Sequence, residues 1–477
     1  MLVGACVWAS PASAQQTRDE PDWAAAGARV TQLLSESIQI PSVNPPGGET
    51  PVAELLAAAL QARGVGAQVL EATPGRGNLI ARVPATEPDG RGALLLLAHL
   101  DVVPADPHAW SFPPFSGAIH DGYVHGRGAL DDKGHAVVFL EALALLAESG
   151  APRGRDIVVA ATAGEEVDGM GVQWLIANHW QALGPPVAVW NEGGASAPFA
   201  EAGGRLVHGI ATGEKRALWL SLVAEGEGGH GSTPIDDSAP NRLVRALTRV
   251  EAWETPIRIS AEVGESMRRV GEGISGFGGF VLGHLDNPLV QALAGGRLTA
   301  SRTINAMVRD TMSLTVIDTG LKHNVIPRSA LARLDVRLLP DTDAEQFVRE
   351  LTRVVADPEV KIVLPKTGIP PIVPASPSDH EVFRAIEAEM GRESPDGIAV
   401  PMQTNGATDS SFFRQRGVPA YGYIPIELGN DLGATMHGLD ERVPVIELER
   451  AVRVTTRALL RLTEPKPADT DAGPRPD

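Results

Sequence analysis

The 477-residue sequence has one cysteine, Cys6, few aromatic residues (4%) and an excess of acidic over basic side chains. A single cysteine excludes an intrachain disulfide, and its position near the N-terminus excludes a cysteine nucleophile in the body of the chain. The formal net charge of -18 argues against nucleic-acid binding and against docking on an anionic membrane, because both need a basic face. After the N-terminal residues, no apolar run is long enough to span a bilayer.

The N-terminus has the pattern of an export signal. A short apolar stretch precedes Ala12-Ser13-Ala14, which has the A-x-A form of a cleavage site. We therefore expect residues 1–20 to be a signal peptide and the protein to be exported, either periplasmic or secreted. The usual basic segment is missing, which indicates a start placed too late in the sequence. The run Val3–Cys6 weakly resembles a lipoprotein box, so a lipoprotein is an alternative.

The rest of the sequence is rich in aliphatic residues and alternates between strand-like and helix-like patterns. The segments Ala93–Asp101 and Asp156–Thr162 have the composition of buried strands, whereas residues 133–149 and 445–462 have an apolar stripe at helical spacing. Strands that alternate with helices predict an α/β fold with a mostly parallel sheet between helix layers.

A change of pattern divides the chain. Residues 212–366 have an α+β pattern, and we interpret them as a domain inserted between two parts of a first domain, 21–211 and 367–463. Within the insert, residues 263–298 are rich in glycine and we expect them to be irregular. The tail, 464–477, is rich in proline and charge, which predicts disorder.

The strand 93–101 ends in two polar residues, His99 and Asp101. Residues two apart on a strand share a face, so both side chains can point toward the edge where open α/β sheets hold ligands. A neutral imidazole is a good zinc ligand, and its second nitrogen needs an acceptor such as Asp101. A polar strand end without function is the alternative.

Two acidic pairs follow. Asp131 and Asp132 precede a predicted helix, where one carboxylate can bridge two cations or simply cap the helix. Glu165 and Glu166 follow the strand 156–162. In a turn, neighbouring side chains diverge, so one can bind a metal while the other acts as a general base. A solvated acidic loop is the alternative for this second pair.

Five motifs occur in the order HLDVVP, GRGALDDKG, GEEVDG, NEGG and MHGLDE. In this order they resemble the zinc-dependent carboxypeptidase, aminoacylase and deacetylase superfamily, which includes glutamate carboxypeptidase and succinyl-diaminopimelate desuccinylase. The resemblance covers the chain from about Trp23 to Leu462. A long loop rich in proline, glycine and aromatic residues, Val102–Gly128, and the enlarged insert make the chain most similar to carboxypeptidase S and the N-acyl-amino-acid hydrolases.

The resemblance implies a catalytic domain of the zinc-peptidase type with two bound Zn²⁺ ions, for which the ligands also admit Co²⁺ or Mn²⁺. The implied ligands are His99, Asp131, Glu166, Glu192 and His437. His99 and Glu192 would share one ion, Glu166 and His437 the other, and Asp131 would bridge both. Asp101 would orient His99, and Glu165 would be the general base. Asn191 stands before Glu192 where several relatives have aspartate, so the assignment of Glu192 depends on that neutral neighbour.

The resemblance also implies that the insert is a lid and dimerisation domain. His230, in GGHGSTP, would reach the active site of a partner subunit and stabilise the oxyanion. Arg337 would bind the free carboxylate of the substrate, because a planar bidentate donor suits that group. Asn324 and Gly406 would line the substrate site. For His230 the alternative is a flexible surface loop, and for Arg337 a charged residue on the sheet's outer face.

The implied function is hydrolysis of an amide bond next to a free carboxylate, either at the C-terminal amino acid of a peptide or in an N-acyl amino acid. A dizinc aminopeptidase is an alternative, although such enzymes typically lack the lid. A non-catalytic binding protein on the same fold is another, although the general base Glu165 is present. The sequence leaves open the preferred acyl group and amino acid, the native metal and the oligomeric state.

Overall fold

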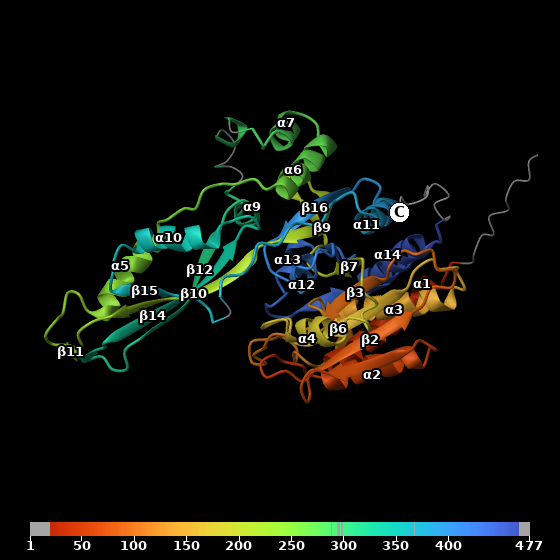
Figure 1. Cartoon of the computed structure of the whole chain (residues 1–477), viewed down its shortest axis with the longest axis horizontal. Coiled ribbons are helices and arrows are strands. Elements are labelled where there is room, and N and C mark those ends of the chain that lie inside the picture. Colours follow the sequence, from red (N-terminus) through yellow and green to blue (C-terminus); the bar gives the residue numbers. More distant parts are fainter. Residues whose placement is uncertain (1–19, 288, 293–295, 297–298, 367, 467–477) are drawn as a thin grey trace, which may run out of the picture.

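The computed structural model describes residues 20–466, except 288, 293–295, 297–298 and 367 (Figure 1). The predicted signal peptide therefore lies outside the described residues except for Glu20, and the predicted tail is described only as far as Lys466. Among the described helices, none is both long and apolar enough to cross a membrane.

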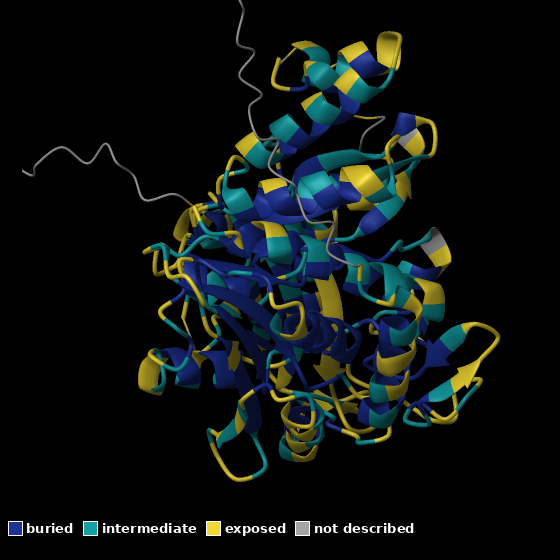
Figure 2. Cartoon of the chain, turned by 90° about the vertical axis from the view of Figure 1, so that its right-hand side faces the viewer, coloured by how far each residue is buried: buried dark blue, intermediate teal, exposed yellow. Residues whose placement is uncertain are grey.

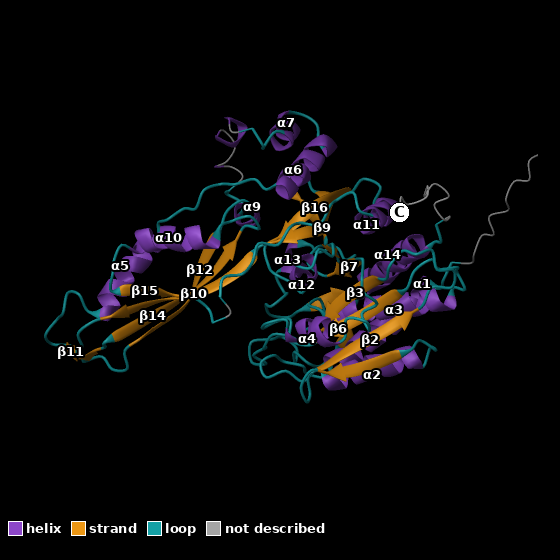
Figure 3. Cartoon of the chain, in the orientation of Figure 1, coloured by secondary structure: helices purple, strands orange, loops and turns teal. Residues whose placement is uncertain are grey.

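A large mixed sheet forms the centre of the first domain (Figure 3). In spatial order its strands are β1 (Ala67–Glu71), β2 (Gly77–Val83), β6 (Ile157–Thr162), β3 (Leu94–His99), β7 (Ala188–Asn191), β17 (Ala420–Gly422), β9 (Arg205–Glu214) and β16 (Ile398–Thr404), and β8 (Ser196–Phe199) pairs with β9. The four strands from β6 to β17 are parallel. Pairs on either side, β1–β2, β2–β6 and β9–β17, are antiparallel. The predicted parallel arrangement thus applies to the centre of the sheet.

Helices cover both faces of this sheet. They are α1 (Trp23–Ile38), α2 (Thr50–Gln61), α3 (Lys133–Glu148), α11 (Glu381–Glu393) and α14 (Val445–Thr463) on one face, and α4 (Met170–Asn178) and α12 (Ser410–Arg414) on the other. Every residue of β3 is buried, and Figure 2 shows buried strands in dark blue at the centre of the domain. Leu94 and Leu96 pack under the first group of helices, whereas Leu95 and Leu97 pack under the second. Alternating side chains on a strand covered on both faces explain this division.

A second, antiparallel sheet projects from the first domain (Figure 1). Its order is β12 (Thr311–Thr319), β14 (Ser329–Leu338), β10 (Arg216–Glu225) and β15 (Val360–Val363), and helices α5 (Ala239–Glu251) and α10 (Ala344–Val355) cover one face. Leu218 and Leu220 of β10 are buried under these helices, whereas Trp219 between them is 52% exposed. At the far tip, β11 (Gly229–His230) pairs with β13 (Val325–Ile326). We call this whole unit the small domain.

The expectation that residues 263–298 are irregular is wrong for part of that range. Helices α6 (Ala261–Gly273) and α7 (Phe277–Gly283) occupy it, and α9 (Arg302–Met307) follows. The Ser260 side chain caps α6 by accepting the N–H of Val263. Val263 and Met267 of α6 share a core with Val400 of β16, so this segment packs on the first sheet. Glycine disfavours a helix, which led to the expectation of irregular structure, but burial against β16 stabilises a helix here.

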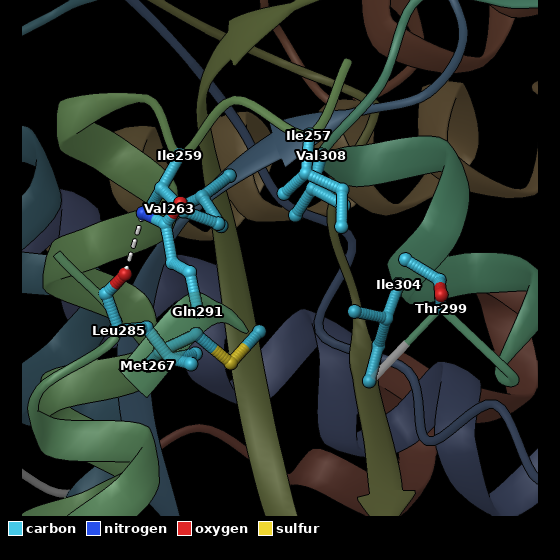
Figure 4. Close-up of a pocket in the computed structure, with 9 residues that line it drawn as sticks. All are labelled: Ile257, Ile259, Val263, Met267, Leu285, Gln291, Thr299, Ile304 and Val308. Carbon is cyan, nitrogen blue, oxygen red and sulfur yellow. Dashed lines mark hydrogen bonds between the residues drawn. The ribbon is translucent and has the colours of Figure 1, made fainter. Parts of the chain in front are cut away.

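Figure 4 shows a small pocket lined mostly by aliphatic side chains of this segment, between α6 and α9. Gln291 in its wall donates a hydrogen bond to the carbonyl of Leu285 (2.8 Å). None of the residues that the sequence predicts for the active site lines it. The remaining short elements are β4 (Ala118–His120), β5 (Tyr123–His125) and β18 (Arg442–Pro444), which form a small sheet, together with η1 (Ala200–Ala202) and α13 (Asn430–Gly433).

Candidate metal centre

The carboxylate of Asp131 lies between two imidazoles. Its Oδ1 is 3.0 Å from Nε2 of His99, and its Oδ2 is 3.0 Å from Nε2 of His437. His99 ends β3, Asp131 lies two residues before the start of α3, and His437 follows α13. Three segments that are distant in sequence therefore meet at the carboxyl end of the parallel strands, where open α/β sheets hold ligands.

Two glutamates complete the cluster, one beside each histidine. Oε1 of Glu192, directly after β7, is 3.6 Å from Nε2 of His99. Oε1 of Glu166, in the turn after β6, is 3.1 Å from Nε2 of His437. The five residues that the sequence predicts as ligands thus lie together as two groups that share Asp131. Nitrogen and carboxylate donors in such groups suit Zn²⁺, Co²⁺ or Mn²⁺.

Asp132 belongs to the same cluster, since its carboxylate lies within metal-binding reach of His99 and Glu192. One of its oxygens accepts the backbone N–H of His99 (3.2 Å). Its side chain makes no capping hydrogen bond at the start of α3, so the geometry gives no support to the alternative of a simple helix cap for this residue.

The charges of the cluster favour a bound cation. Burial raises the pKa of Glu165 and of Glu192 well above the usual value, and neighbouring carboxylates raise it further. Burial would also raise the pKa of Asp131, but hydrogen bonds from His437 and His99 hold it below its usual value. Hydrogen bonds with Asp131 and Glu166 raise the pKa of His437 to about 10. Several carboxylates that share a buried space are stable as anions only beside positive charge.

Asp101 contacts other residues besides His99. The Nδ1 atom of His99 is 3.0 Å from the backbone carbonyl of Asp101 and 3.5 Å from its carboxylate. The carboxylate accepts the backbone N–H groups of Glu165 and Glu166, both at 3.1 Å, and the side-chain amide of Asn44 at 2.8 Å. Asp101 thereby fixes the turn that carries both glutamates, a contact that sequence analysis missed.

Two further residues near the cluster were missed. Asp409 is buried, accepts a hydrogen bond from the Thr162 hydroxyl (3.0 Å), and has a pKa that burial raises to about 7. Glu441 is fully buried and accepts the backbone N–H of Asp131 (3.1 Å). The motif MHGLDE contained Glu441, but a charged residue in a loop gives no sign of its burial.

Gly406 lies in the loop after β16, close to the end of β7. The Thr404 hydroxyl at the start of this loop donates a hydrogen bond to the carbonyl of Gly193 (2.8 Å), the residue after Glu192. This contact brings the end of β16, two residues before Gly406, next to the residue that follows Glu192.

The remaining predicted residues lie on the small domain. His230 and Asn324 meet at its tip, where Asn324 accepts the N–H of Gly231 (2.9 Å), and His230 is exposed. The guanidinium of Arg337, on β14, donates hydrogen bonds to both carboxylate oxygens of Asp335 (2.7 and 3.1 Å). Figure 1 shows β11 at the opposite end of the small domain from β3, so His230 does not join the metal cluster of its own chain.

Comparison with known sequences points to one family. The profile of peptidase family M20/M25/M40 matches residues 95–461. The N-fatty-acyl-amino acid synthase/hydrolase PM20D1 of Homo sapiens is 31% identical over 387 residues, which are 80% of this chain and 75% of that protein. Aminoacylase-1 of Sus scrofa is 26% identical over 436 residues, 90% of this chain and 94% of that protein. A probable carboxypeptidase S-like 2 of Dictyostelium discoideum is 29% identical and covers 75% and 69%.

Solved structures share the fold. A metallo-carboxypeptidase of Sulfolobus solfataricus superimposes with a TM-score of 0.68 at 20% identity, over 90% of this chain and 98% of that one. A dinuclear metal-binding peptidase of Bacillus subtilis gives a TM-score of 0.57 at 13% identity, over 93% and 100%. Family profile, relatives and fold agree: the chain belongs to peptidase family M20/M25/M40 and is a metal-dependent amidohydrolase.

Proposed function

We propose that the protein is a dizinc hydrolase of amide bonds that adjoin a free carboxylate, with N-acyl amino acids or the C-terminal residues of peptides as substrates. The observation on which this depends is the Asp131 carboxylate, one oxygen of which faces His99 while the other faces His437. A carboxylate placed in this way suits the bridge between two ions of a dimetal site. Relatives named for N-acyl amino acids and for carboxypeptidases support the substrate class.

His99 and Glu192 would hold one ion, Glu166 and His437 the other, and Asp131 both. Bound as a pair, such ions lower the pKa of a shared water and polarise an amide carbonyl. The carbonyl of Asp101 accepts from Nδ1 of His99 (3.0 Å), which leaves the lone pair of Nε2 for the metal. Co²⁺ or Mn²⁺ would fit the same donors.

Glu165 is the proposed general base. Asp101 holds the backbone of both glutamates, and the carboxylate of Glu166 faces His437, which leaves the carboxylate of Glu165 for the role of the base. Glu165 takes the proton of the attacking water and gives it to the leaving nitrogen. Burial raises the pKa of Glu165, which makes its carboxylate a stronger base for this proton.

The small domain is proposed to act as a lid and dimerisation domain, in an insert with bounds 212–366. Arg337 would exchange its contact with Asp335 for the substrate carboxylate, and Asn324 and Gly406 would line the site. His230 would stabilise the oxyanion in the partner subunit of a homodimer. The edge strand β12 supports the dimer, because it is exposed at nearly every position and includes Leu314 and Ile317. We further propose export through a signal peptide at residues 1–20.

The decisive experiment is a substrate panel on purified protein with known metal content. We expect hydrolysis of N-acyl amino acids or dipeptides, loss of activity with a chelator, and recovery with Zn²⁺. Amino-acid amides with a free amine test the aminopeptidase alternative, since they lack the carboxylate. Hydrolysis of those amides alone would refute the proposed substrate class. Absence of chelator-sensitive hydrolysis on the whole panel would favour a binding protein.

A further inference from the structure

One buried carboxylate connects the two segments that carry Asp131 and His437. We propose that Glu441 is a positioning residue, which fixes Asp131 against His437 so that the two can share a metal ion. The inference rests on the proposed dimetal function and assigns a role to a residue that would touch neither metal nor substrate.

Glu441 binds the backbone of the Asp131 segment with both oxygens. Oε1 accepts the N–H groups of Leu130 (2.8 Å) and Asp131 (3.1 Å). Oε2 accepts the N–H of Gly128 (3.1 Å) and Nη1 of Arg127 (2.6 Å). The side chain is 0% exposed. Four donors on one buried carboxylate leave the segment little freedom to shift.

The same segment binds back to the chain around Glu441. Nη2 of Arg127 donates to the carbonyl of Gly438 (2.8 Å), directly after His437. The N–H of Gly126 donates to the carbonyl of Glu441 (2.8 Å). The guanidinium of Arg127 also lies over the Trp110 ring, 5.0 Å from its centre. Contacts in both directions make the two segments one rigid unit, and strands β5 and β18 extend it by pairing.

The turn that carries His437 needs this support. His437 and Asp440 have positive φ angles of 56° and 55°. Such angles are costly for residues with a side chain and persist only where the surroundings determine them. Both carboxylate oxygens of Asp440 accept hydrogen bonds from Ser111, from its N–H (2.7 Å) and its hydroxyl (2.8 Å). Glu441 adds the link from this strained turn to Asp131.

The two metal positions should therefore depend on Glu441 unequally. His99 and Glu192 reach the centre from the ends of β3 and β7, which the central sheet holds in place. The position between Glu166 and His437 depends on the turn that Glu441 connects to Asp131. A metal site requires its ligands within about 0.5 Å of their places, so a small shift of that turn weakens one site selectively.

The test is metal titration of the full-length protein after its metals have been removed. In Glu441→Gln, one oxygen becomes an NH₂ group that faces N–H donors and cannot accept from them. We expect the wild type to bind two Zn²⁺ ions, and E441Q to bind one with unchanged affinity and the second about 10–100-fold more weakly, the usual effect of an outer contact. Calorimetry gives both affinities, and elemental analysis gives the stoichiometry.

Glu389→Gln is the matched control. Glu389 is also a buried glutamate, but it lies on α11 and pairs with Arg461 of α14, and it has no contact with the residues of the metal cluster. Two unchanged sites in E441Q would overturn the inference. If E441Q does not fold, Arg127→Lys is the deciding variant. It keeps the positive charge but loses the paired donors of the guanidinium, which bind Glu441 and Gly438, and it must selectively weaken the binding of the second ion. A wild type that binds fewer than two ions would instead refute the dimetal function.

Discussion

The metal cluster and the tip of the small domain differ in how they are built. At the cluster, side chains from distant segments lie within about 3 to 4 Å of one another, as in the 3.0 Å contacts of Asp131 and the 3.6 Å contact between His99 and Glu192. At the tip, His230 lies on a two-stranded ribbon of β11 and β13, where its Nδ1 is 2.6 Å from the Ser232 hydroxyl and Asn324 accepts the N–H of the neighbouring Gly231. The residues of the first region all come from one chain and lie together, whereas the second region lies apart from them on the small domain.

This difference has a physical cause. The carboxyl ends of parallel strands lie at the same edge of the sheet, so polar residues at those ends lie close together. The small domain is joined to the first domain by extended connections and shares little core with it. A domain joined in this way suits the proposed lid.

The largest expected effect tests the cluster alone. Glu165→Ala should lower kcat by about 10²–10⁴-fold, the usual contribution of a positioned general base. Metal content should stay near that of the wild type, because Glu165 is not a proposed ligand. Elemental analysis beside steady-state kinetics checks both. Loss of both metal ions in this variant would reassign Glu165 as a ligand.

The next effect tests whether the tip belongs to another subunit's site. His230→Ala should lower kcat by about 10²–10³-fold, as for loss of one oxyanion donor, with metal content unchanged. Mixing this variant with Glu165→Ala should restore about a quarter of wild-type activity, because half of the dimers are mixed and each mixed dimer has one complete site of two. No recovery from stably mixed dimers would place His230 in its own subunit's site.

A smaller effect separates substrate binding from chemistry. Arg337→Met should raise KM for a substrate with a free carboxylate by about 10–100-fold, which corresponds to one charge-assisted hydrogen-bonded pair of about 1.5–3 kcal/mol. The same substrate as its amide should bind both proteins alike. Equal losses for acid and amide would mean that Arg337 acts only through its contact with Asp335.

The smallest effect is the number of protons released when the metal binds. His437, with a pKa of about 10, holds a proton at pH 7 without metal, and contacts with Asp101 and Asp131 raise the pKa of His99 despite its burial. Metal requires neutral imidazole, so binding at pH 7 should release at least the proton of His437. Calorimetry in buffers of different ionisation enthalpy measures this number. Release of no proton would contradict the proposed ligands.

The raised pKa of His437 also predicts how the stability of the metal-free protein changes with pH. The pKa of His437 is higher in the folded state than the usual value of about 6.5 in the unfolded state. Its contribution to folding is therefore complete below pH 6.5 and is lost as the pH rises toward 10. Thermal unfolding of the metal-free protein from pH 6 to 10 should show this decline, and His437→Ala should reduce it.

The sequence by itself determined the α/β class, the buried strand that ends at His99 and the polar residues at the strand ends, because apolar runs and polar strand ends are local signals. Glu192 and His437 were implied only by the resemblance of their motifs to a known family. The sequence predicted the parallel centre of the sheet but not the antiparallel pairs β1–β2, β2–β6 and β9–β17, and it missed α1 and the helices within 263–298. Glycine-rich segments fold into helices there because they bury apolar side chains against β16, which no local pattern records.

Only the tertiary structure decided which groups support the cluster. Asp101, which the sequence analysis assigned only to His99, also fixes the glutamate turn, and Glu441, which it passed over, holds the backbone of Asp131. Their partners include backbone N–H groups far away along the chain. A residue of almost any type can donate its backbone N–H, so the sequence does not reveal such a hydrogen bond. The separation of His230 from the cluster was likewise decided by the direction in which the small domain projects.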